Sequence, residues 1–136
     1  MSYLVEIVEG DSAYSVMVEE DDRVAYAYLR DDAAIVSDVW LYNLAPAPER
    51  PEWTEKGAAP FLNPRSFVRE EPPPRVSAAS DVRCRWYRDN HRLLWVEVEI
   101  HDVVYGRLAP GERPGWARLA KSDGPLAKVL EQETVA

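Results

Sequence analysis

Apolar and polar side chains alternate along much of this chain, as expected of β-strands with one buried face. Four such runs lie in the first third, at residues 3–7, 14–18, 23–29 and 35–42, and polar turns separate them. Short strands at this even spacing are typical of an antiparallel all-β domain. In the third and fourth runs apolar groups fall on both faces, which indicates a sheet covered on both sides. The pattern predicts a four-stranded meander over residues 1–43.

A second alternating segment, from Asp81 to His101, predicts a β-hairpin. With the turn centred on Asn90, the apolar pairs are Trp86 with Leu94, Cys84 with Val96, and Val82 with Val98. On the opposite face, Arg83 then meets Glu97 and Arg85 meets Trp95. Because a slip of one residue would mix the two sets, the pattern favours this pairing.

Between and after these strands the periodicity changes. Residues 44–80 hold eight of the eleven prolines, which excludes regular central strands over much of this stretch. Its apolar residues, among them Trp53 and Phe67, predict an ordered crossover packed over a sheet, with a short strand near residues 66–69. Near the end, the sequence Ser-Asp-Gly-Pro at 122–125 and an apolar stripe predict a helix over residues 122–134.

These elements predict a single mainly-β (α+β) domain of 136 residues. We expect an antiparallel two-sheet sandwich or a strongly curved open barrel, with a Pro-rich crossover and one C-terminal helix. Its parts are the acidic meander (1–43), the crossover (44–80), the hairpin with its following strands (81–121) and the C-terminal helix (122–134).

Charge is distributed unevenly. Residues 1–42 contain ten acids and two arginines, whereas residues 43–136 contain fourteen of each sign, so the net charge of −8 belongs to the first third. The negative electrostatic field of this segment disfavours binding of nucleic acid, whose phosphates require cations, and it attracts basic partners. We therefore expect a small acidic, non-catalytic binding or inhibitor-type protein, like an immunity protein or antitoxin, that recognises a basic protein. The candidate contact residues are the turn acids Glu19, Glu20, Asp21, Asp22, Asp31 and Asp32.

Two alternatives rest on other side chains. Trp40, Tyr42 and Trp53 flank the start of the crossover, and they predict an aromatic-lined cleft for a small ligand. Glu97, Glu99 and His101 share one face of a strand, as in a metal-dependent or acid–base enzyme, although Arg83 competes for Glu97. No nucleophile, phosphate-loop or metal motif is present in the sequence, so we expect no cofactor and no catalysis.

The remaining features concern location. The N-terminal segment has no basic region and carries acids within its apolar run, unlike a signal peptide. No run reaches the roughly 18 apolar residues of a membrane helix. The single cysteine, Cys84, has no partner for an internal disulfide. We expect a cytoplasmic protein without a membrane partner.

Overall fold

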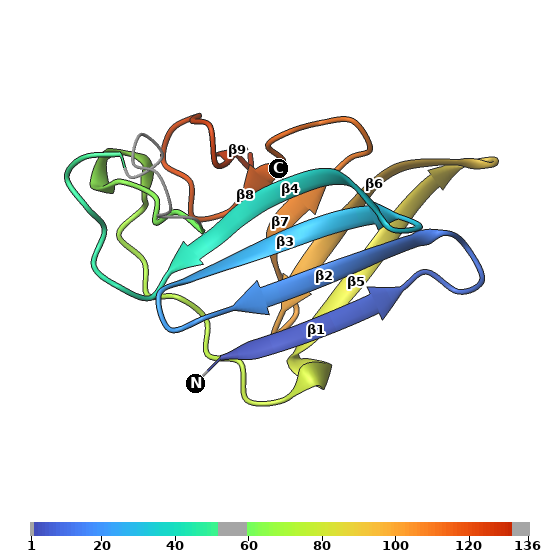
Figure 1. Cartoon of the computed structure of the whole chain (residues 1–136), viewed down its shortest axis with the longest axis horizontal. Coiled ribbons are helices and arrows are strands. Elements are labelled where there is room, and N and C mark those ends of the chain that lie inside the picture. The colour runs from blue at the N-terminus through green and yellow to red at the C-terminus, as the bar shows by residue number, and fades with distance from the viewer. Residues whose placement is uncertain (1, 52–59, 132–136) are drawn as a thin grey trace, which may run out of the picture.

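The chain forms two open β-sheets that pack against each other (Figure 1), in a computed structural model that describes residues 2–51 and 60–131. Sheet 1 is antiparallel and consists of β1 (Tyr3–Val8), β2 (Tyr14–Glu20), β3 (Val24–Asp31) and β4 (Ala34–Asn43). Sheet 2 is mixed and consists of β5 (Val82–Asp89), β6 (Arg92–Ile100), β7 (Val103–Leu108), β8 (Trp116–Ala117) and β9 (Lys128–Val129). In both sheets the spatial order of the strands follows the chain.

Sheet 1 is the predicted meander, and its burial follows the alternation of the sequence. Val16, Val18, Ala27 and Leu29 point inward and are wholly buried. Two register shifts interrupt the pairing of β3 with β4, at Ala25/Tyr26 and at Leu29/Arg30. Such irregularities change which side chains of β4 face inward, and they explain why periodicity did not identify the inner face of these strands.

The core lies between the sheets, where Val96, Val98, Ile100 and Leu108 of sheet 2 meet the inner residues of sheet 1. The two layers approach closely at Gly106 of β7. A Cβ atom placed on Gly106 would lie 2.6 Å from Cδ2 of Leu41 in β4. The packing of the other sheet therefore favours glycine at this point, because any larger residue would require Leu41 to move.

The hairpin is present, but the predicted register is wrong by two residues. Val82 pairs with Ile100, Cys84 with Val98 and Trp86 with Val96, around a two-residue turn at Asn90 and His91. The turn centres between Asn90 and His91 instead of on Asn90, which moves the pairing by one residue, and the register shift at Tyr87/Arg88 moves it by one more. Because a shift of two residues preserves parity, Val96 and Val98 remain on the buried face as predicted.

The charged pairs change with the register. Arg83 lies opposite Glu99 instead of Glu97, and Arg85 lies opposite Glu97 instead of Trp95. Near the turn, the extra residue also leaves Leu93 buried, with 3% of its surface exposed, whereas Leu94 is only half-buried.

The predicted C-terminal helix is wrong for residues 122–131, which contain no helix. The amide of Val129 donates to Oδ1 of Asp123, and that of Gly124 donates to the carbonyl of Ala127, so the apolar residues follow a turn. The strand β9 then joins β8 in parallel and extends sheet 2. Backbone bonds to a neighbouring strand thus replace those of a short isolated helix, which is marginal in water. Residues 132–134 of the predicted helix lie outside the described residues.

The crossover is ordered over its described part and contains two 3-10 turns, η2 (Arg65–Phe67) and η3 (Ala79–Asp81). The hydroxyl of Tyr26 in β3 donates to the carbonyl of Phe61 at 2.7 Å, and Leu62 is 5% exposed. The strand expected near residues 66–69 is reduced to one bridge between Val68 and Ala120. Within residues 2–51 and 60–131 no helix is long and apolar enough to cross a bilayer.

Candidate functional site

Sheet 1 and its turns carry the entire formal charge of −8, because β1–β4 lie within the acidic first third. One face of this sheet packs on sheet 2, and the other, its outer face, is turned toward the viewer in Figure 1. The covering crossover reaches this outer face at Tyr26, near the start of β3. Within the described ranges, the outer side of β1, β2 and the centre of β3 carries exposed Leu4, Glu6 and Val8 and half-buried Met17 and Tyr28.

Strand pairing places a mixed set of apolar and acidic side chains on that outer side. One row across the sheet is Glu6, Met17, Tyr28 and Asp38, and Leu4 pairs with Glu19 beside it. Leu4 and Val8 are 63% and 53% exposed. We call this surface the acidic face, and its members are Leu4, Glu6, Val8, Met17, Glu19, Tyr28, Arg30 and Asp38.

The acids of this face act on its central tyrosine. Burial raises the pKa of Tyr28 to about 12, with further contributions from the charges of Glu19, Asp38 and Asp21. A tyrosine surrounded by carboxylates experiences the negative potential that a basic partner would neutralise. Two cations contact the acids of this face: Arg30 pairs with Glu6, and Nε of Arg113, from the loop after β7, lies 3.7 Å from Asp38.

The turn acids proposed from the sequence are not brought together. Glu19 belongs to the acidic face, but Glu20 points inward, is 8% exposed and accepts a hydrogen bond from the hydroxyl of Tyr42 at 2.7 Å. Asp21 accepts the amides of Arg23 and Val24 at 2.7 and 2.8 Å, which closes the β2–β3 turn. Its role in the turn is structural.

The remaining turn acids lie elsewhere on the surface. Asp22 is exposed in the same turn as Asp21. Asp31 is the last residue of β3 and Asp32 follows it in the β3–β4 connection, so both lie at the other end of β3. Asp32 has a φ of 54°, and its amide donates to Ala13. The length of β3, roughly 25 Å at 3.3 Å per residue, separates the two acidic turns, so they do not form one contact surface.

The predicted aromatic cleft does not form around Trp40 and Tyr42. Trp40 is 0% exposed and Tyr42 is 1% exposed. The indole of Trp40 donates to Oδ1 of Asn43 at 2.8 Å, so its polar atom is satisfied inside the protein. Both rings are core residues, and Trp53 lies outside the described residues.

The three residues of the predicted metal or acid–base site have separate partners. Glu97 accepts hydrogen bonds from Tyr87 and Arg107, while Glu99 lies 3.4 Å from Nε of Arg85. His101 has left the strand for the β6–β7 turn, where its φ is 51° and Nε2 lies 2.5 Å from the carbonyl of Arg75. Among the described residues, no three His, Cys, Asp or Glu side chains are grouped to hold a metal ion.

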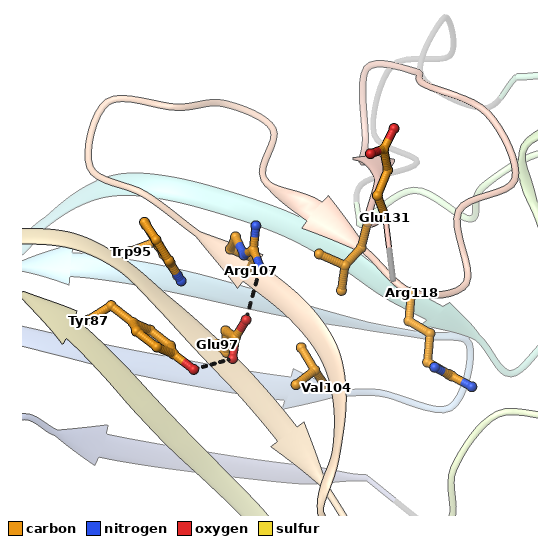
Figure 2. Close-up of a pocket in the computed structure, with 8 residues that line it drawn as sticks. Tyr87, Trp95, Glu97, Val104, Arg107, Arg118 and Glu131 are labelled. Atoms are coloured by element: carbon orange, nitrogen blue, oxygen red, sulfur yellow. Dashed lines mark hydrogen bonds and ion pairs between the residues drawn. The ribbon is translucent and has the colours of Figure 1, made fainter. Parts of the chain in front are cut away.

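A pocket on the outer face of sheet 2 was not predicted. It has a volume of about 490 Å³ and is shown in Figure 2. Its lining residues are Tyr87, Trp95, Glu97, Val104, Arg107, Arg118, Leu130 and Glu131. The alternation of β6 placed Trp95 and Glu97 on this face, but the other residues join them only through strand pairing and the path of the C-terminal segment.

Comparison of the chain with models of protein families, with curated proteins and with solved structures finds no match. The surfaces of this molecule are therefore the basis for inferring its function.

Proposed function

We propose that this chain is a small, non-catalytic binding protein that recognises a basic protein partner through the acidic face of sheet 1, as an immunity protein or antitoxin masks a toxin. The observation that carries the proposal is the outer face of β1–β3. There, exposed Leu4 and Val8 and half-buried Met17 and Tyr28 lie among Glu19, Glu6 and Asp38.

The composition of this face suits recognition. Tyrosine and methionine are enriched at the centres of protein interfaces, where they supply large contact areas. Carboxylates around such a centre favour a cationic partner and accelerate its encounter. Sheet 1 carries the full net charge of −8, so the long-range field favours the same class of partner.

The partner surface is tested by affinity capture with matched variants. The double variant Leu4→Arg/Glu19→Lys changes the acidic face, and both side chains lie on the outer side of the sheet. A control, Val103→Arg/Glu112→Lys, makes the same chemical changes on exposed residues of β7 and the following loop. We expect a basic protein to be retained by the wild type and the control but lost with the acidic-face variant.

Two outcomes contradict the proposal. A captured partner without excess positive charge would remove the electrostatic argument. A basic partner retained equally by both double variants would place the contact on another surface of the protein. Circular dichroism and urea titration of each variant establish that it is folded before capture is compared.

A further inference from the structure

The pocket on sheet 2 is built around three stacked side chains from neighbouring strands. The rings of Tyr87 (β5) and Trp95 (β6) stack with centroids 5.1 Å apart and an interplanar angle of 26°. The guanidinium of Arg107 (β7) lies over the Trp95 ring, 5.2 Å from its centroid. Arg118 and Glu131 lie on the other side of the pocket from this stack (Figure 2), and Leu130 also lines it.

The carboxylate in this pocket is already paired. Glu97 is 9% exposed, and its two oxygens accept the hydroxyl of Tyr87 at 2.9 Å and a guanidinium nitrogen of Arg107 at 3.0 Å. Arg107 therefore neutralises Glu97 inside the pocket. The other carboxylate, Glu131, is exposed at the rim.

Hydrogen-bond donors remain in excess. Among the described residues, Nε1 of Trp95, Nε of Arg107 and Nε of Arg118 are buried and make no hydrogen bond. Arg118 is ion-paired with Glu71, with 3.7 Å between Nε and Oε2, which is too long for a hydrogen bond. Buried donors without acceptors are unfavourable, so a ligand that supplies oxygen acceptors is favoured here.

From this excess of donors we propose that the pocket binds a small organic anion, a carboxylate attached to a flat or apolar body. Its carboxylate oxygens accept hydrogen bonds from the terminal guanidinium nitrogens of Arg107 and Arg118, because these side chains are 33% and 26% exposed although their Nε atoms are buried. Its body lies against Val104 and Leu130, the apolar residues of the lining. The site is on the outer face of sheet 2 and is independent of the acidic face of sheet 1.

The test adds three probes to the full chain, which separate the ring from the anion, and follows their binding by ¹⁵N–¹H NMR. Benzoate carries both the ring and the carboxylate, benzyl alcohol carries only the ring, and acetate carries only the anion. We expect benzoate to shift the indole signal of Trp95 and the Nε signals of Arg107 and Arg118 saturably, with a millimolar dissociation constant, because so small a ligand has few contacts. Trp95→Phe identifies the indole signal.

A matched pair of variants locates the anion. Arg118→Gln is expected to weaken benzoate binding by about tenfold, the effect of losing one charge-assisted hydrogen bond. Arg113→Gln removes the same charge from an exposed loop and is expected to change binding less than about twofold. Equal weakening by the two variants, equal shifts with benzyl alcohol or acetate, or no saturable benzoate shift in the wild type would each overturn the proposal.

Discussion

At the residue scale, neighbouring acids of β2 have opposite environments because side chains alternate across a strand. Glu19 faces outward among the acidic-face residues, whereas Glu20 ends a buried chain of hydroxyls. Tyr42 donates to Glu20 at 2.7 Å and lies 2.8 Å from the hydroxyl of Tyr3. Burial raises the pKa of Tyr3 to about 12, so both phenols remain protonated donors at neutral pH.

The hydrogen bonds that link Tyr3, Tyr42 and Glu20 predict the effect of Tyr42→Phe. The substitution removes the phenol that donates to Glu20, and it leaves a carboxylate that is 8% exposed without this bond. We expect the free energy of unfolding to fall by about 1–3 kcal/mol at neutral pH in urea titration. Tyr3→Phe is the control, since Tyr42 can still donate to Glu20. A larger loss for Tyr3→Phe than for Tyr42→Phe would contradict this order.

At the element scale, strand pairing responds to contacts beyond the local alternation. The hairpin keeps its predicted buried face but its pairing moves by two residues. One comes from a tight turn centred between Asn90, whose φ is 55°, and His91, and the other from the shift at Tyr87/Arg88. The next strand, β7, is adapted to the opposite sheet at Gly106, where β4 leaves no room for a side chain. Each strand is thus shaped by its turn and by the layer it faces.

The contact at Gly106 predicts a coupled pair of substitutions. Gly106→Ala places a Cβ 2.6 Å from Leu41, so we expect a loss of about 1–3 kcal/mol in unfolding free energy, as for overpacked cores. Leu41→Ala alone should also destabilise the protein, because it leaves a cavity. In the double variant the two losses should not add, since the smaller residue 41 makes room for the new methyl group. Strict additivity in urea titration would argue against this close approach of the sheets.

At the scale of the whole molecule, the two sheets are joined by their core and by an ion pair between their turns. Arg88, near the tip of the β5–β6 hairpin, donates Nε and a terminal nitrogen to the two oxygens of Glu9 at 2.8 and 2.6 Å. The hydrogen bonds from Arg88 lower the pKa of Glu9 below its ordinary value of 4.5, and burial opposes them only in part. A bidentate pair of this kind connects segments 79 residues apart.

This ion pair predicts a pH-dependent difference between wild type and Arg88→Gln. The pKa of Glu9 is depressed by folding, so its contribution is present above pH 4.5 and is lost as pH falls through the folded-state value. We expect the wild type to have the higher urea midpoint at pH 7 and the difference to shrink in this acidic range. Arg92→Gln, at an exposed position in the same hairpin, serves as the control. A difference that stays constant with pH would assign the effect of Arg88 to packing.

The charge of sheet 1 predicts how a captured basic partner associates. Its association rate should fall steeply with added salt, while dissociation changes less, because screening acts mainly on the encounter. Neutralising Glu6 and Glu19 to Gln should slow association in stopped-flow measurements. Neutralising Asp31 and Asp32 to Asn should slow association less, because these acids lie at the end of β3 that is distant from Glu19. A rate independent of salt and of all four changes would remove electrostatic steering from the proposal.

The sequence by itself determined the elements whose evidence is local. Alternation identified β1–β4 and the buried face of the hairpin, because the two-residue period of a strand is a property of each segment. The same local evidence failed at residues 122–131, where the helical spacing of Leu126, Val129 and Leu130 was overridden by backbone pairing with β8. Spacing alone does not show whether a neighbouring strand is available.

Only the tertiary structure decided the pairing register, the burial and partners of the acidic side chains, and the position of the pocket. The register depends on the centre of the turn and on one extra residue beside it, and the pairing of Glu9 depends on an arginine 79 positions away. Trp95 and Glu97 were placed on one face by their spacing, but Arg107 and Arg118 reach them from other strands and loops. Alternation specifies the side of a strand on which a residue lies, whereas contacts between distant segments determine what that residue meets there.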